Sequence, residues 1–440
     1  MTSPSLTPDT GAAAAALARE DGPAVELKTW TNPRKGFLFF LAFASIGAGM
    51  GQLVPAVETI ALKATAISGP KHAAITVSIV IAIAALFSIV AFPVFGRISD
   101  RLRGRLGRRR PFLILGGILF ALGAIVLIAA NSVFPLVIGG ILSTVGFTSV
   151  TVAVTAIIPD QFEPLRRGPS SSIVGLSLPL GAVIGLGIAS AVSFSLTLQL
   201  LIPAAIAVVG ALVFAAVLND PQVSDAPRPK FDAVQFFSTF WVNPVKHPSF
   251  AWAWFSRLLI FFGVAAVQAY QIFYLLAVLH VPGQAVANDI FLSTLVLTIA
   301  ALIFAPIAGK ISDRVKRRKP FVITAAIIFA IGLGVAASSH SFGGFLVAIG
   351  IVGAGQGVYF AVDLALVSQL VPDPTNPAQG MGIMGLASTV PSSLVPALAP
   401  ALLLIGSSAA TPQNYPALFL TGAIAAVVGA ALILPIRGVK

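Results

Sequence analysis

The sequence contains no cysteine and few charged residues: only 10% of its 440 residues are Asp, Glu, Lys or Arg. The missing cysteine excludes disulfides and thiolate metal sites. Soluble domains carry roughly 25% charged residues. In this chain 57% of the residues are hydrophobic instead, and a water-soluble protein could not cover so much apolar surface. The composition therefore predicts an all-α integral membrane protein.

Motifs of catalysis are absent as well. The sequence has no HExxH, no Walker loop, no nucleophile elbow and no Cys/His cluster. It also has no N-x-[ST] sequon, which, like the missing cysteine, indicates a bacterial origin. We therefore expect no enzymatic activity, no cofactor and no metal. Any work that the protein does across the membrane is then expected to draw its energy from an ion gradient.

The apolar residues are grouped in runs that are long enough to cross a membrane, which takes roughly 20 helical residues. We predict about twelve transmembrane helices near 37–61, 75–96, 112–131, 135–158, 171–193, 198–218, 250–279, 287–309, 320–338, 344–370, 381–405 and 415–435. Residues 1–35 lack the charged and apolar regions of a cleavable signal, so we expect the first helix to remain in the mature protein.

The formal net charge of +12 comes largely from two short loops. The basic residues there are Arg97, Arg101, Arg103, Arg105, Arg108, Arg109, Arg110, Lys310, Arg314, Lys316, Arg317, Arg318 and Lys319. Basic loops on one side of a membrane protein mark the cytoplasmic side. The pattern predicts a multi-pass inner-membrane protein with both termini in the cytoplasm, and it explains the charge without a nucleic-acid partner.

A repeat divides the chain into two halves. Residues 96–112 read GRISDRLRGRLGRRRPF, and residues 309–321 read GKISDRVKRRKPF. Each copy follows the second span of its half and precedes the third. The sequence therefore predicts two six-helix bundles of the same orientation, related by an axis along the membrane normal.

The polar, proline-containing segment between the halves sets the predicted boundaries. We expect a cytoplasmic tail at 1–35, a first bundle at 36–218 and a second bundle at 248–436. A cytoplasmic linker at 219–247 joins the bundles, and residues 437–440 form a short cytoplasmic end.

The repeated loop resembles the signature of the major facilitator superfamily, G-x-x-x-D-[RK] followed by basic residues, between helices two and three. The matching residues are Gly96, Asp100, Arg101, Arg108 and Arg109 in the first copy and Gly309, Asp313, Arg314, Arg317 and Arg318 in the second. The longer first copy is similar to the branch that contains plant sucrose transporters and glycoside–pentoside–hexuronide cation symporters. The resemblance implies a monomeric, proton- or sodium-coupled carrier of a small solute such as a sugar, with the repeated loops latching the cytoplasmic side. In contrast to the sucrose transporters, the fourth span has no acidic residue inside the membrane.

Ionisable groups inside a bilayer are costly and are therefore functional candidates. Asp363 in the tenth span shares a helix face with Gln356 and Tyr359, at spacing i, i+3, i+7. This face offers a carboxylate, an amide and a phenol to a proton, a cation or a sugar hydroxyl. The alternative is a buried structural carboxylate.

Two more ionisable groups lie near the ends of spans. Glu58 follows Gln52 in the first span, after three glycines that weaken the helix or allow close packing. It either serves coupling or reaches outer water and pairs with Lys63. Arg257, in the seventh span, either extends to the headgroups or pairs with an acidic gate residue.

Uncharged polar residues complete the predicted cavity. Gln271 and Tyr274 in the seventh span suit sugar binding, because amides bond hydroxyls and aromatic faces stack on C–H surfaces. Thr148 belongs to a threonine row in the fourth span, which contacts cargo or bonds to helix backbones.

Three functions fit these observations. The first is a cation-coupled sugar or glycoside symporter. The second is a proton-coupled drug or metabolite exporter of the same fold. The third is a membrane receptor with a transporter fold, which binds a ligand without moving it.

Overall fold

The computed structural model describes residues 36–102, 106–162, 168–220, 242–315, 317–370, 377–407 and 413–436. These residues form helices and no strands. The helices of the first half are α2 (Phe37–Val54), η1 (Pro55–Thr59), α3 (Ile60–Ser68), α4 (Pro70–Arg101), α5 (Arg110–Ala129), α6 (Val133–Gln161), α7 (Gly168–Ala191) and α8 (Leu196–Val217). Those of the second half are α10 (Pro248–Ala277), α11 (Gly283–Val315), α12 (Lys319–Ser338), α13 (Phe342–Leu370), α14 (Pro377–Thr389), α15 (Pro391–Leu402) and α16 (Tyr415–Ala431).

Eleven stretches of the described residues are long and apolar enough to cross a membrane, and Tyr415–Ala431 is a shorter twelfth. The prediction of about twelve transmembrane helices is confirmed. Several helices extend beyond the predicted runs. The second span begins at Pro70 rather than near residue 75, because the polar residues Lys71 and His72 continue the helix past its apolar part.

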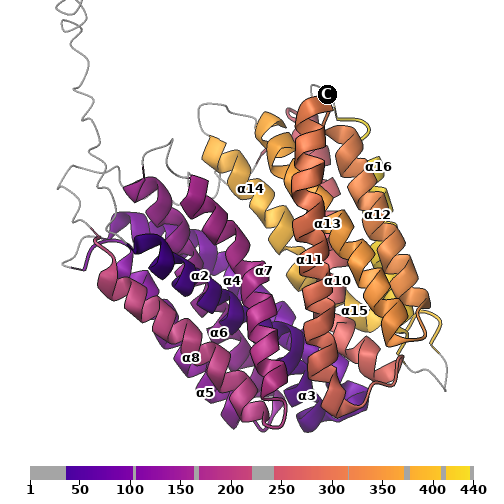
Figure 1. Cartoon of the computed structure of the whole chain (residues 1–440), viewed down its shortest axis with the longest axis horizontal. Coiled ribbons are helices and arrows are strands. Elements are labelled where there is room, and N and C mark those ends of the chain that lie inside the picture. The colour runs from indigo at the N-terminus through magenta and orange to yellow at the C-terminus, as the bar shows by residue number, and fades with distance from the viewer. Residues whose placement is uncertain are drawn as a thin grey trace, which may run out of the picture.

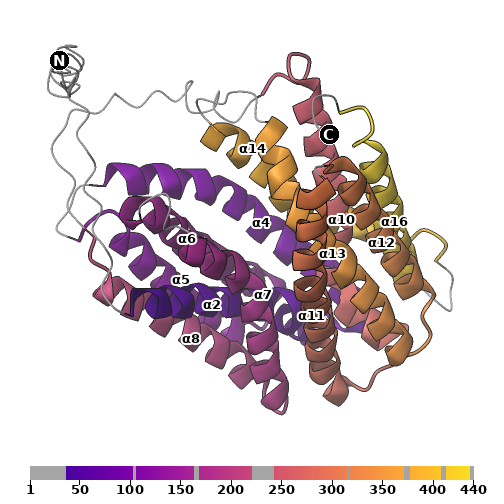
Figure 2. The same ribbon diagram turned by 45° about the horizontal axis from the view of Figure 1, so that its top comes forward.

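The described residues form six spans in each half, and the spans of each half form one bundle. The two bundles lie side by side (Figures 1 and 2). We call the side on which α2 begins and α16 ends the terminal side, and the opposite side the far side. The bundles converge at the far side, where α3 lies, and diverge toward the terminal side, where the chain ends (Figure 1). Contacts between the bundles are made chiefly by α4 with α15, α7 with α11, and η1 with α10. The predicted N-terminal tail, most of the predicted linker and the last four residues lie outside the described residues.

The repeated loops begin equivalent helices with the same backbone. Arg109 precedes α5 with φ −101° and ψ −34°, and Arg318 precedes α12 with φ −100° and ψ −34°. Proline follows within the first turn of both helices, where its missing N–H has no intrahelical partner to lose. Sequence and structure therefore repeat together.

Two spans are interrupted. The first contains the π-helical turn η1, which begins at Pro55 and joins α2 to α3. The eleventh is split into α14 and α15 at Val390, before Pro391. Pro179, by contrast, lies inside the unbroken helix α7. Both interruptions adjoin the central cavity, and π-turns of this kind are frequent at functional sites.

Candidate functional site

A cavity of about 270 Å³ lies between the two bundles. The residues that line it come from both halves, chiefly from the first span, α4, α6, α10 and the broken span α14–α15. Its polar lining residues are Gln52, Ser88, Ser143, Thr144, Gln268, Ser388, Thr389 and Ser392. Its larger apolar lining residues include Leu53, Val57, Ile60, Val80, Ile81, Phe147 and Leu178. No ionised side chain of the described residues is among them.

Gln52 has an unused hydrogen-bonding atom at this cavity. Its Oε1 is buried and has no protein partner. A buried amide oxygen without a partner is costly, so a donor is expected to reach it from the cavity. Ser388 and Ser392, from the broken span, already donate to the carbonyl oxygens of Gly385 and Thr389. Their hydroxyl oxygens retain the capacity to accept a bond from a solute.

A second polar group lies inside the C-terminal bundle. Arg257 of α10 and Asp363 of α13 form an ion pair, with Nη1 and Oδ2 2.8 Å apart. Tyr359, one turn before Asp363, bonds to the carboxylate, and Phe261 lies with its ring centroid 5.5 Å from the guanidinium. Asp363 is buried, and its partner Arg257 is largely buried. Of the two interpretations of Arg257, the structure shows the pairing with an acidic residue.

Gln356 and Tyr359 line a small cavity beside this ion pair. The predicted shared face of Gln356, Tyr359 and Asp363 is thus formed, but it lies within the C-terminal bundle, next to α10 and α12. None of the three residues lines the central cavity. One connection between Asp363 and a solute runs through α10, which carries both Arg257 and the cavity residue Gln268.

Glu58 is fully buried, so the prediction that it could reach outer water and pair with Lys63 is wrong. Gln199 of α8 donates to its Oε1 at 3.0 Å, and Oε2 has no partner. Lys63 instead donates to the carbonyl oxygen of Ile128 at 2.8 Å. Glu58 lies on η1 behind the cavity wall, which the same turn forms with Pro55 and Val57.

Three other predicted residues lie in the packing rather than at the cavity. The Tyr274 hydroxyl lies 2.6 Å from the carbonyl oxygen of Ala336 and 2.8 Å from that of Ser339, inside the C-terminal bundle. Thr148 bonds to Ser88 and to its own helix at Thr144, and Gln271 is buried without lining the cavity. The nearby polar residues Gln268 of the seventh span and Ser143 and Thr144 of the fourth span do line the cavity.

The first copy of the repeated loop is fastened to the terminal-side ends of its own bundle. Arg109 donates through Nε to Asp160 of α6 at 2.8 Å and through Nη1 to Ser99 at 2.7 Å, and Arg108 lies 3.4 Å from Asp160. Asp220 accepts from the backbone N–H groups of Arg109 and Arg110 at the start of α5. A carboxylate at that position is stabilised by the positive end of the helix dipole.

The small residues of the motif face open space. A Cβ added at Gly96 would meet nothing within 4 Å, and one at Gly309 would meet only Ala361 at 3.8 Å. In the second copy, Arg314 and Arg317 are exposed and Arg318 is half-buried. The side chains of Asp100, Arg101 and Asp313 lie outside the described residues. Asp160 and Asp220 were not predicted, because neither stands in the repeated motif.

The described residues contain no group of three or more His, Cys, Asp or Glu side chains arranged to hold a metal ion.

The model of the Major Facilitator Superfamily matches residues 36–305 and 289–439, which together cover nearly the whole described chain. The chain belongs to the Major Facilitator Superfamily. No curated protein matches it by sequence. The match is to the superfamily as a whole and distinguishes no branch of it.

Solved structures of other superfamily transporters share the fold of this member. The nucleoside transporter NupG is similar with a TM-score of 0.69 at 12% identity, covering 91% of this chain and 100% of that one. A D-xylose–proton symporter has a TM-score of 0.65 at 16% identity, with 92% and 98% covered. A bacterial homolog of the human lysosomal transporter Spinster, in an inward-facing and occupied conformation, has a TM-score of 0.65 at 15% identity, with 91% and 97% covered. At these identities the likeness shows the fold alone.

Proposed function

We propose that this superfamily member moves a neutral, hydroxyl-rich solute, such as a sugar or a glycoside, by alternating access. The observation that carries the proposal is the chemistry of the cavity between the bundles. Its polar groups are amides and hydroxyls from both halves, with no ionised side chain among the described residues that line it, and Gln52 offers an unpaired acceptor. Such groups bond to solute hydroxyls, whereas a charged solute would be buried there without a counter-charge.

The basic loops set the orientation in this proposal. Arg108 and Arg109 precede α5, which begins at Arg110, and Arg317 and Arg318 precede α12, all on the terminal side. By the positive-inside rule, the terminal side is cytoplasmic, in an inner membrane. The conformation is then inward-facing, with the bundles closed at the outer side and apart at the cytoplasmic side.

Coupling to protons is assigned to the Arg257–Asp363 pair. A proton on Asp363 removes its attraction for Arg257, and so changes how α10 is held against α13. Because α10 also forms the cavity wall at Gln268, this change can reach the solute. Glu58, behind the opposite wall, is a second candidate for carrying a proton. Sodium is the alternative coupling ion, and we propose that the carrier works as a monomer.

The apolar part of the wall favours one alternative, a proton-coupled exporter of drugs or metabolites. Val57, Ile60, Val80 and Ile81 present a continuous aliphatic surface that would suit a lipophilic cargo. The two functions differ in direction. A symporter accumulates its solute with the proton gradient, whereas an exporter removes it.

The experiment that tests the proposal measures proton entry into proteoliposomes when a panel of neutral sugars is added. Wild type is compared with Asp363→Asn and with the control Asp289→Asn. Asp289 lies at the far-side end of α11 and does not line the cavity. We expect sugar-evoked proton entry in wild type and the control, lost in Asp363→Asn although that variant folds.

The other outcomes distinguish the alternatives. Normal coupled transport by Asp363→Asn contradicts the assignment of the coupling site. Sugar uptake that depends on sodium would show that sodium, not the proton, is the coupling ion, and would leave the proposed cargo unchanged. Extrusion of lipophilic compounds without a response to any sugar supports the exporter. Sugar binding without flux supports the receptor.

A further inference from the structure

One hydrogen bond joins the two bundles deep inside the far side. Ser78 of α4 and Tyr270 of α10 have their hydroxyl oxygens 2.5 Å apart. Both residues are buried, with 3% of Ser78 and none of Tyr270 exposed. Polar contacts in such surroundings are worth more than at a wet surface, and are costly when one partner is missing.

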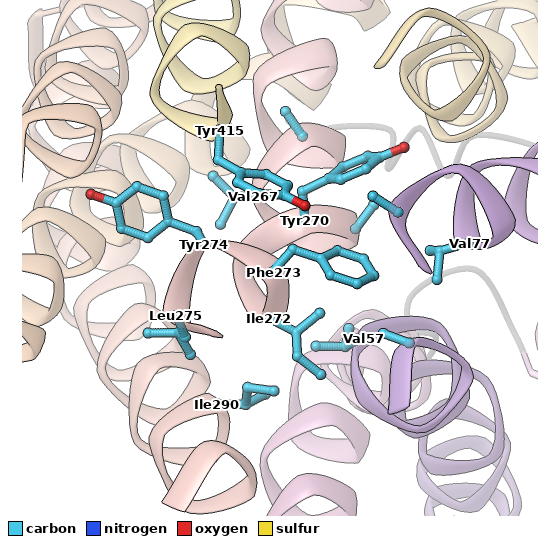
Figure 3. Close-up of a cluster of buried hydrophobic side chains, with 14 of the residues drawn as sticks. Val57, Val77, Val267, Tyr270, Ile272, Phe273, Tyr274, Leu275, Ile290 and Tyr415 are labelled. Carbon is cyan, nitrogen blue, oxygen red and sulfur yellow. The ribbon is translucent and has the colours of Figure 1, made fainter. Parts of the chain in front are cut away.

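The pair lies directly beyond the central cavity. On α4, Val80 and Ile81 line the cavity, and Ser78 lies two residues before Val80, toward the far side. On α10, Gln268 and Ala269 line the cavity, and Tyr270 follows them. Figure 3 shows Tyr270 and Phe273 on the side of α10 that faces Val57 and Val77 of the other bundle. A solute that crosses between the cavity and the far side must pass this layer.

The proton count fixes the direction of the bond. Ser78 has one hydroxyl proton, and it donates to the carbonyl oxygen of Ala74 at 2.7 Å. Tyr270 is therefore the donor to Ser78 Oγ. Loss of the tyrosine hydroxyl leaves Ser78 bonded to its own helix. Loss of the serine hydroxyl leaves the tyrosine donor buried without an acceptor.

A second polar contact between described residues of the two bundles on this side is more exposed. Gln413 donates to the carbonyl oxygen of Lys71 at 2.9 Å, at an exposed position where water can replace either partner. The remaining contacts include close apolar packing, such as that between Gly187 and Phe291. Of these two polar contacts between described residues, the buried pair is the more sensitive to opening of this side.

We propose that Tyr270 and Ser78 form the outer gate of the transporter, a single directed hydrogen bond that breaks each time the far side opens. The proposal rests on alternating access and on the orientation given above. In the open state both hydroxyls meet water, so the bond stabilises only the closed state. Its removal should shift the equilibrium toward the outward-open state.

The test measures distances between spin labels at Phe194→Cys and Gln284→Cys in nanodiscs without added solute. Both positions are exposed at the far side, at the α7–α8 turn and at the start of α11. Because the chain has no cysteine, the two labels are unique. The variants are Tyr270→Phe and Ser78→Ala, and the control is Tyr274→Phe, whose hydroxyl bonds only within the C-terminal bundle.

We expect Tyr270→Phe to raise the ratio of long to short distances about fivefold, the effect of one hydrogen bond. Ser78→Ala should raise it about tenfold, because it leaves a buried donor unpaired. Tyr274→Phe should leave the ratio unchanged.

Two results would overturn the gate. If a long-distance population exists but Tyr270→Phe changes the ratio of long to short distances no more than Tyr274→Phe does, the proposed gate is contradicted. Alternating access is supported in that case. If no variant shows a long-distance population, alternating access fails with it. If the two variants raise the ratio as expected but the protein takes up no sugar, the gate is supported and only the proposed sugar cargo is contradicted.

Discussion

Arg257 and Asp363 are 106 positions apart in the chain and 2.8 Å apart in space, joining the seventh and tenth spans within the C-terminal bundle. Each side chain is the principal counter-charge of the other, and Tyr359 bonds to the carboxylate. A pair that is so nearly buried is stable only while both partners are present.

The first prediction follows from this dependence. Arg257→Gln should lower the free energy of unfolding by about 3 kcal/mol, because it leaves Asp363 buried without its counter-charge. The double variant Arg257→Gln/Asp363→Asn should regain part of the loss, because neither charge remains. Chemical unfolding in detergent measures both. An equal or larger loss in the double variant would contradict an energetic coupling between the two charges.

Close approach of α2 and α7 gives the second prediction. A Cβ at Gly181 would lie 2.8 Å from the backbone of Gly49, whereas one at Gly175 on the same helix would meet nothing within 4 Å. Gly181→Ala should therefore force the helices apart and lower the free energy of unfolding by about 1–3 kcal/mol. Gly175→Ala should be neutral or stabilising by about 0.5 kcal/mol.

Thermal unfolding of the two alanine variants, side by side, measures this difference. Equal melting temperatures would show that α2 and α7 do not pack as closely as described.

Glu58 and Gln199 give the third prediction. Glu58→Gln keeps a carbonyl oxygen that accepts from Gln199, so the free energy of unfolding should change by less than about 1 kcal/mol. Gln199→Leu leaves the carboxyl without its side-chain donor, and should cost about 1–3 kcal/mol. Denaturant titration of both variants would contradict this account if Glu58→Gln were the more damaging change.

The fold was largely predictable from the sequence, because hydropathy marks membrane spans and the repeated loop marks the two halves. The loop copies at Arg109 and Arg318 even begin their helices with the same dihedral angles. Helix ends were less predictable, since helices such as α4 continue through polar residues beyond their apolar part.

The candidate site was predictable only in part. Hydropathy identifies Asp363 and Arg257 as ionisable residues in spans, but their pairing depends on the rotation of two helices against each other. The same rotation turns Tyr274 into the packing of the C-terminal bundle (Figure 3). It places Gln268, three residues before Gln271, at the cavity. The π-turn at Glu58 is a tertiary feature, and no local pattern marks Asp160 as the partner of Arg109.

Binding of a neutral solute in the cavity between the bundles is tested by solute protection of a cysteine placed there. Ser392→Cys places a unique thiol at the cavity wall, and Val245→Cys, at a residue 86% exposed outside it, is the control. The rate of maleimide labelling is followed with and without each neutral sugar. We expect at least one sugar to slow labelling at position 392 and to leave labelling at position 245 unchanged. If no sugar slows labelling at position 392, while lipophilic compounds do, the claim that this cavity binds a neutral, hydroxyl-rich solute is contradicted.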